Sequence, residues 1–169
     1  MNSRICFAFK DNKLRSRPKG LSLQECQDLA IQESVEDIEV RWKGIDDKFT
    51  VQFASFLRGC SIVTHIDLAD NYIGDSGCKE LAESLSQLPM LRKLVLSGNR
   101  LGDLGFAILS SMLTVNSTIT ELDLSGNMVR KTGMQALGSG LRENISLRSL
   151  KLDELFFGDD GAGVGTVLP

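Results

Sequence analysis

The chain has 169 residues, of which 42% are hydrophobic and 24% are charged, and its formal net charge is −3. This composition predicts one soluble globular domain and argues against a disordered chain, which carries too little apolar surface to form a core. The small negative charge does not favour nucleic acid or acidic membranes as partners, and no apolar run approaches the roughly 20 residues of a membrane span.

The cysteine spacing and the first ten residues of the chain indicate its cellular compartment. The four cysteines are spread along the chain, and none forms a C-x-x-C pair. This spacing predicts neither a zinc site nor a redox motif, and reduced thiols are typical of a cytoplasmic protein. The first ten residues are too interrupted by polar side chains for a secretory signal. We therefore expect a cytoplasmic location, no metal and no cofactor.

Residues 1–20 are predicted to form a basic N-terminal arm. They hold six basic side chains and one acid, Asp11. Such a charge run is either a solvated loop or a segment that docks on an acidic surface. The alternation of Ile5, Phe7 and Phe9 also permits a short edge strand in this segment.

Residues 21–34 are predicted to form a helix that caps the N-terminal end of a repeat array. Ser22 and Glu25 have the spacing of a capping box, and an apolar face continues at Leu23, Cys26 and Leu29. A repeat array needs such a cap because each repeat buries its apolar face only against its neighbours.

A pattern with a period of 28 residues runs over residues 35–169. Three segments follow LxxLxLxxNxL, and their asparagines are Asn71, Asn99 and Asn127. The first copy has Lys43 in place of the asparagine, and the last copy has Leu155. Glycine and leucine positions downstream keep the same period. We therefore predict five repeats, of which three are clean and the first and last are degenerate.

Each repeat is expected to contain a short strand, a turn and a helix. The LxL core is typical of a strand that points two side chains into the core, because successive side chains alternate between faces. The asparagine amide can bond the backbone of the turn at every repeat. Apolar residues at i and i+4 then indicate a helix, so strands of successive repeats must pair in parallel.

These motifs resemble the leucine-rich repeat family, specifically its ribonuclease-inhibitor-like subfamily with 28-residue repeats. The resemblance covers about four-fifths of the chain. It implies an α/β solenoid with a curved parallel sheet on the concave face and helices on the convex face. It specifies function poorly, because similar repeats serve inhibitors, GTPase-activating proteins, innate-immune sensors, and actin-related or ciliary scaffolds.

The C-terminal end of the predicted array has no cap. The last copy stops at Val167–Pro169, part-way through its expected helix, and Leu155, Phe156 and Phe157 have no following repeat to cover them. We expect this edge to be covered by missing repeats of a longer protein or by another subunit.

Two motifs suggest chemistry, but each has a simpler explanation. The glycine-rich run 158–165 lacks the following helix and acidic residue of a dinucleotide loop. His65, Asp67 and Ser97 contain the residue types of a catalytic triad, yet they would lie on an open sheet without an oxyanion hole. We therefore predict that the chain is not an enzyme.

Two further pairs of residues have structural explanations. The glycosylation sequons at Asn116 and Asn144 occupy the same slot of the repeat, where asparagine can end a helix in the left-handed conformation. Cys60 and Cys78 are expected to fill small spaces in the core. The place of Cys78 near a helix start leaves a lowered thiol pKa as an alternative.

The exposed strand positions of the concave face are the best candidates for function. Trp42, the only tryptophan, lies near this face as an interface anchor or packs against the N-terminal helix. No aromatic or basic stripe suited to nucleic acid is present. The predicted partner-binding residues are Asp37, Glu39, Trp42, His65, Asp67, Lys93, Val95, Glu121, Asp123 and Lys151.

The sequence therefore predicts a non-catalytic protein–protein interaction module that binds a protein partner through its concave face. One alternative is a structural subunit of a large ciliary or cytoskeletal assembly, held by its termini. Another is a regulator similar to GTPase-activating proteins, although such proteins usually have more repeats and no arginine here lies in a recognisable catalytic motif.

Overall fold

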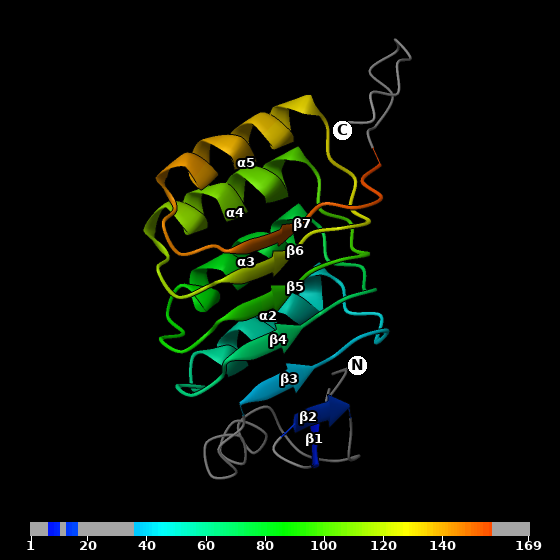
Figure 1. The fold of residues 1–169 in the computed structure, drawn as a ribbon. Helices are drawn as coiled ribbons and strands as arrows, with labels where there is room; N and C mark the ends of the chain where they lie inside the picture. The colour runs from blue at the N-terminus through cyan, green and yellow to red at the C-terminus, as the bar shows by residue number, and fades with distance from the viewer. Residues whose placement is uncertain (1–6, 11–12, 17–35, 157–169) are drawn as a thin grey trace.

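The computed structural model of the chain describes residues 7–10, 13–16 and 36–156 (Figure 1). Five three-residue strands recur through the main described segment, and a helix follows each of the first four. The strands are β3 (Asp37–Glu39), β4 (His65–Asp67), β5 (Lys93–Val95), β6 (Glu121–Asp123) and β7 (Ser149–Lys151). The helices are α2 (Asp47–Leu57), α3 (Asp75–Leu85), α4 (Asp103–Val115) and α5 (Lys131–Glu143).

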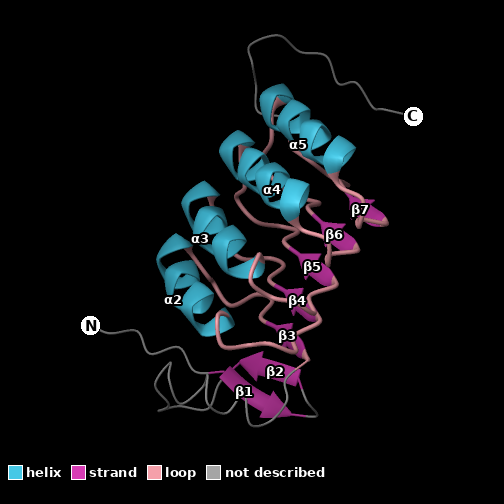
Figure 2. Cartoon of the chain, turned by 90° about the vertical axis from the view of Figure 1, so that its left-hand side faces the viewer, coloured by secondary structure: helices cyan, strands magenta, loops and turns pink. Residues whose placement is uncertain are grey.

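Strands β3 to β7 pair in parallel, in the order in which they occur in the chain. Their register matches the 28-residue period: His65 lies opposite Lys93, and Lys93 opposite Glu121. The strands line one side of the molecule and the helices stack along the other (Figure 2). This arrangement confirms the predicted α/β solenoid with a parallel sheet. We call one strand with its following turn a rung.

A β-hairpin extends the sheet at its N-terminal end. Strand β1 (Phe7–Lys10) pairs antiparallel with β2 (Lys13–Ser16), and β2 pairs in parallel with β3. Part of the predicted basic arm therefore belongs to the sheet, as the alternation at Phe7 and Phe9 permits. The predicted capping helix over 21–34 and the glycine-rich run 158–165 lie outside the described residues.

The core lies between the sheet and the helices. The central side chain of each strand from β3 to β6 is buried, and leucines of the helices meet it from the other side. Phe49, which takes the place of a glycine in the first repeat, is buried and stacks on Phe53. In the last repeat, Leu147, Leu150 and Leu152 are only partly buried.

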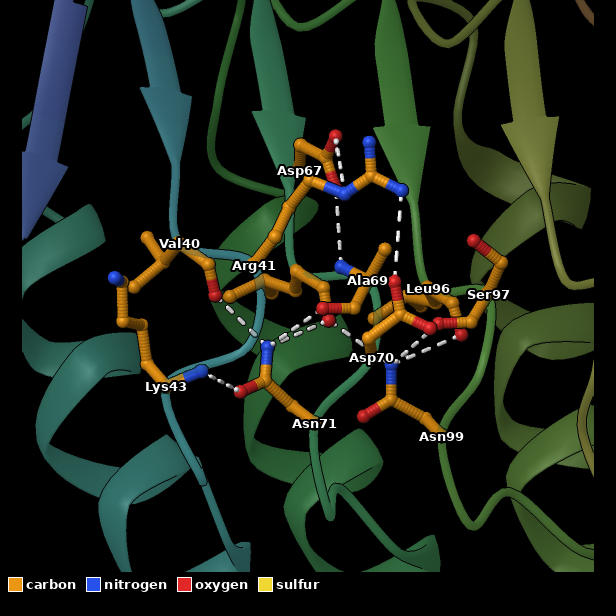
Figure 3. Close-up of polar contacts among 11 residues, drawn as sticks. Val40, Arg41, Lys43, Asp67, Ala69, Asp70, Asn71, Leu96, Ser97 and Asn99 are labelled. Carbon is orange, nitrogen blue, oxygen red and sulfur yellow. Dashed lines mark hydrogen bonds and ion pairs between the residues drawn. The ribbon is translucent and has the colours of Figure 1, made fainter.

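The repeated asparagines join neighbouring rungs. Asn71 accepts hydrogen bonds from the backbone N–H groups of Lys43 and Ile45 at 3.0 and 3.1 Å, and its amide donates to Val40 O at 2.8 Å and Leu68 O at 2.9 Å. Figure 3 shows how Asn71 and Asn99 occupy equivalent places in successive turns. Each asparagine thus bonds its own turn and the preceding one, which confirms the predicted asparagine column.

A second ladder consists of carboxylates at the helix starts. Gly74 N donates to Asp47 Oδ1 at 2.6 Å, and Gly102 N donates to Asp75 Oδ1 at 2.7 Å. Asp103 accepts from the backbone N–H of the next repeat and from the Thr132 hydroxyl, and mainly this side-chain hydrogen bond lowers its pKa below the ordinary value. The ladder fixes where each helix begins relative to its neighbour.

Close packing along this ladder explains the repeated glycines inside the helix starts. A Cβ on Gly105 would lie 2.6 Å from Asp75 Oδ1, and one on Gly133 would lie 2.7 Å from Asp103 Cα. These contacts are shorter than carbon and oxygen atoms tolerate, so a side chain here would push adjacent rungs apart.

Candidate functional site

The exposed side chains of the strands form columns on the concave face. The strand register aligns Asp37, His65, Lys93, Glu121 and Ser149 in one column, and Glu39, Asp67, Val95, Asp123 and Lys151 in the next. A shallow hollow of about 270 Å³ lies on this face, with its floor on β5 and β6. The predicted partner-binding residues of the strands are thus brought together on one preformed surface.

Arg41 links the first two rungs at one edge of this surface. Its Nε lies 3.6 Å from Asp67 Oδ2, and its Nη2 lies 3.5 Å from Asp70 Oδ2 (Figure 3). Asp67 also accepts a hydrogen bond from Ala69 N at 3.0 Å and is only 9% exposed. Asp67 therefore helps to hold the turn after β4 and offers little surface of its own.

The first column contains two further contacts between a basic side chain and a carboxylate. Lys93 Nζ lies 3.7 Å from Glu121 Oε2, and His65 Nδ1 lies 3.9 Å from Asp37 Oδ1. The buried Nε2 of His65 has no hydrogen-bond partner among the described residues. Asp123 differs from these acids, since Ser125 N donates to it at 3.0 Å and no cation within residues 36–156 pairs with it.

Trp42 lies in the turn after β3 and is 74% exposed. Its φ of 56° is in the left-handed region, which bulky side chains rarely adopt. The equivalent slot of later rungs holds Asp70, Gly98, Gly126 and Glu154, and all have positive φ. Trp42 is thus not buried against the described helices, and the N-terminal helix named in the alternative lies outside the described residues.

The geometry does not support a catalytic triad. His65 contacts Asp37 rather than Asp67, and Asp67 bonds Ala69 and Arg41 instead. The side chains therefore do not form the nucleophile–base–acid sequence that a triad needs. Among the described residues, no group of three or more histidine, cysteine or acidic side chains could hold a metal ion.

Both cysteines in the described part of the chain are buried thiols. Burial raises the pKa of Cys60 to about 12, and burial together with the nearby Asp75 and Asp47 raises the pKa of Cys78 to about 12. The core placement is confirmed, and the alternative of a lowered pKa at Cys78 is wrong. Desolvation is the largest cause, because burial disfavours the charged thiolate.

The two sequon asparagines hold turns between a helix and the next strand. Asn116 has φ −80° and Asn144 has φ −76°, so the expected left-handed conformation is wrong. Asn144 instead accepts from Leu147 N at 2.7 Å and donates to Leu113 O at 2.7 Å. The side chain ends the helix from an extended backbone, because its amide bonds two stretches of main chain at once.

The predicted partner-binding set left out two pairs of residues. Arg41 and Asp70 form the ion pair at the edge of the face, and Tyr72 carries the guanidinium of Arg100 over its ring at 4.4 Å. The 28-residue spacing of Tyr72 and Arg100 is visible in the sequence, but it lies outside the strand columns that the prediction followed.

A comparison with protein families decides the classification. A family model described as “Leucine Rich repeat” matches residues 59–82, 87–106 and 115–138. The chain contains leucine-rich repeats. The three matches fall on the three clean repeats, whereas the ribonuclease-inhibitor-like subfamily stays a prediction.

A solved structure described as “Leiomodin-1 Actin-Binding Site 2 (ABS2)” is similar to this leucine-rich-repeat chain. The TM-score is 0.69 at 20% sequence identity, and the likeness covers 80% of this chain and 78% of that chain. At this identity the likeness shows the fold alone. No curated protein sequence is significantly similar to the chain. No helix within the described residues has the length and apolar character to span a membrane.

Proposed function

We propose that this leucine-rich-repeat chain is a non-catalytic protein-interaction module that binds its partner through the concave sheet face. The observation that carries the proposal is the alignment of polar strand positions on one rigid, hollowed surface. A preformed surface loses little conformational entropy when a partner binds, which favours docking by a folded protein.

The charges of this face favour a basic partner. Six carboxylates and three cationic side chains lie in the two strand columns and at the second position after each strand, which is Arg41, Ala69, Ser97, Ser125 or Asp153. Arg41 and Lys93 each lie beside a carboxylate, so the excess negative charge is concentrated at Asp123 and in the flanking columns. Asp123 therefore meets the basic groups of the partner together with the neighbouring Glu121, whose half-exposed side chain exchanges Lys93 for them, while Asp67 holds the turn.

Trp42 supplies an anchor at the rim of the same face. A tryptophan in a left-handed turn costs about 1–2 kcal/mol relative to glycine. Most of its side-chain surface is exposed, so packing against the described residues does not offset this cost. Contact with a partner gives the ring the burial that it lacks in the free chain.

The test uses amide substitutions, which remove charge but keep hydrogen-bond acceptors. We expect the double variant Glu121→Gln/Asp123→Asn to recover at least about tenfold less partner in a quantitative pulldown, because two interfacial charge contacts are lost. Glu83→Gln, on the exposed side of α3, is the matched control. Equal recovery by the double variant and the control would contradict binding through this face.

A cytoskeletal partner is the first to examine, because the similar solved structure is described as an actin-binding site. We expect the chain to pellet with purified actin filaments and the double variant to pellet less. Absence of the wild-type chain from the pellet would reject actin, while the pulldown would still test the concave face.

A further inference from the structure

A second exposed stripe runs along the turns that lead from the strands into the helices. It consists of Tyr72, Arg100, Met128 and Phe156, which are spaced 28 residues apart and follow each asparagine position. We call these four residues the turn stripe. None of them belongs to the columns of the concave sheet face.

Backbone pairing holds the turn stripe in register. Tyr72 N donates to Ile45 O at 2.8 Å, Arg100 N to Ile73 O at 2.9 Å and Met128 N to Leu101 O at 3.0 Å. Met128 and Phe156 also form a parallel bridge. Adjacent rungs are about 4.8 Å apart, so the four side chains span about 14 Å on a rigid surface.

The exposed surface of the turn stripe is mostly apolar. Tyr72 is 53% exposed, Met128 59% and Phe156 62%. Isolated apolar residues on a surface need no explanation, but these are grouped, since Met128 and Phe156 lie in adjacent rungs and Tyr72 lies on the other side of Arg100. The position that follows each asparagine position is exposed in every described rung, and it holds residues of different kinds, beginning with Gly44. The repeat fold therefore does not require large apolar side chains there.

Arg100 gives the stripe a charge in its centre. Its guanidinium lies over the Tyr72 ring at 4.4 Å, and no carboxylate of the described residues forms an ion pair with it. Stacking on an aromatic ring orients the planar guanidinium and leaves its N–H edges for a hydrogen-bonding anion. The apolar neighbours on both sides favour a ligand that carries a carboxylate between apolar side chains.

We propose that the turn stripe binds an extended segment of a partner protein that presents one acidic residue flanked by apolar side chains. The carboxylate pairs with Arg100, and the flanking side chains contact Tyr72 on one side and Met128 with Phe156 on the other. This surface is separate from the concave face, so one chain has room for two contacts.

The probe is a phage-displayed library of random ten-residue peptides, selected on the full chain. We expect the enriched peptides to share an aspartate or glutamate with apolar neighbours. A labelled enriched peptide should lose at least about tenfold in affinity when its acid is replaced by the amide, because a charge-assisted hydrogen bond is lost. Enriched peptides without an acid, or an amide twin that binds equally, would overturn the proposal.

Variants of the chain locate the binding site of that peptide. Arg100→Glu and Met128→Glu should each weaken it at least about tenfold, since each opposes the ligand's charge. Lys79→Glu makes the same charge change as Arg100→Glu on the exposed side of α3 and should leave the affinity unchanged. Asp123→Asn, on the concave face, should also leave it unchanged. Circular dichroism melts of all variants establish that each is folded.

Two results would contradict the assignment of the turn stripe as a peptide-binding site. Peptide affinity that survives both Arg100→Glu and Met128→Glu would overturn the proposal. Sedimentation that finds a dimer of the wild-type chain, abolished by Met128→Glu, would overturn it in favour of a second copy of the chain as the occupant.

Discussion

The first and the last described rungs both depart from the repeat pattern, yet their side chains are buried to different extents. The first rung lacks the asparagine, but Ile38, Val40 and Ile45 are as buried as their counterparts in the clean repeats. The last rung keeps leucines at the strand positions, and Leu150 and Leu152 are only partly buried.

Neighbouring rungs account for this difference. The turn of the first rung is bonded by Asn71 from the second, so its own asparagine is not needed. The strand leucines of the last rung have a described neighbour on one side only, because no strand within the described residues pairs with the far edge of β7. Burial in a repeat array is therefore set by adjacent repeats as much as by the sequence of the repeat itself.

The largest expected difference is between two leucines in the same slot. Leu94→Ala removes a fully buried side chain of β5 and should lower the free energy of unfolding by about 4 kcal/mol, whereas Leu150→Ala in β7 should lower it by about 1 kcal/mol. Urea denaturation measures both. Equal losses would contradict the conclusion that interior rungs are packed more tightly than the last described rung.

The asparagine slot should show the same contrast at a smaller scale. Asn99→Leu leaves the buried N–H of Ile73 without a side-chain partner and removes one of the two asparagine donors to each of the Leu68 and Leu96 carbonyls. We expect a loss of about 3 kcal/mol. Leu155→Asn, the reverse change in the last rung, should alter stability by less than about 1 kcal/mol. Thermal and urea unfolding of the two variants measure this contrast, and similar losses would contradict it.

Substitutions at the turn position with positive φ should change stability with opposite sign in the first rung and in an interior rung. Gly98 has φ 64°, and a Cβ there would clash with Asp70 Oδ1, so Gly98→Ala should destabilise the chain by about 2 kcal/mol. Trp42→Gly should stabilise it by about 1 kcal/mol, because glycine relieves the strained turn. Urea denaturation of both variants measures the sign of the change in the free energy of unfolding. A destabilised Trp42→Gly would imply that the ring packs against the free chain.

The smallest expected effect tests whether water is excluded from the thiol of Cys78. Its pKa is raised from an ordinary value of 9.0 to about 12, so the thiol ionises first in the unfolded chain and stability is lost as the pH rises from 9 towards 12. Between pH 9 and 10 the wild-type chain should lose about 1 kcal/mol relative to Cys78→Ala. Parallel urea curves for the two proteins would show that the thiol is not desolvated.

Much of this molecule was predictable from spacing, although some local details were not. The period of Asn71, Asn99 and Asn127 predicted the parallel strands and the strand columns correctly. The carboxylate ladder of Asp47, Asp75 and Asp103 has the same period, but its role depends on which backbone N–H groups face it. The backbone at Asn116 and Asn144 was predicted wrongly, because helix-ending asparagine has two conformations and tertiary contacts select one of them.

The sequence by itself determined the repeat, its length and the residues that share a face, because a period of 28 places equivalent side chains at equivalent positions of every rung. Only the tertiary structure decided how those side chains pair. It set Arg41 between Asp67 and Asp70, left Trp42 exposed in a left-handed turn, and stacked Arg100 on Tyr72. The physical reason is that contacts between rungs depend on distances of a few ångströms across the chain, which a one-dimensional pattern does not contain.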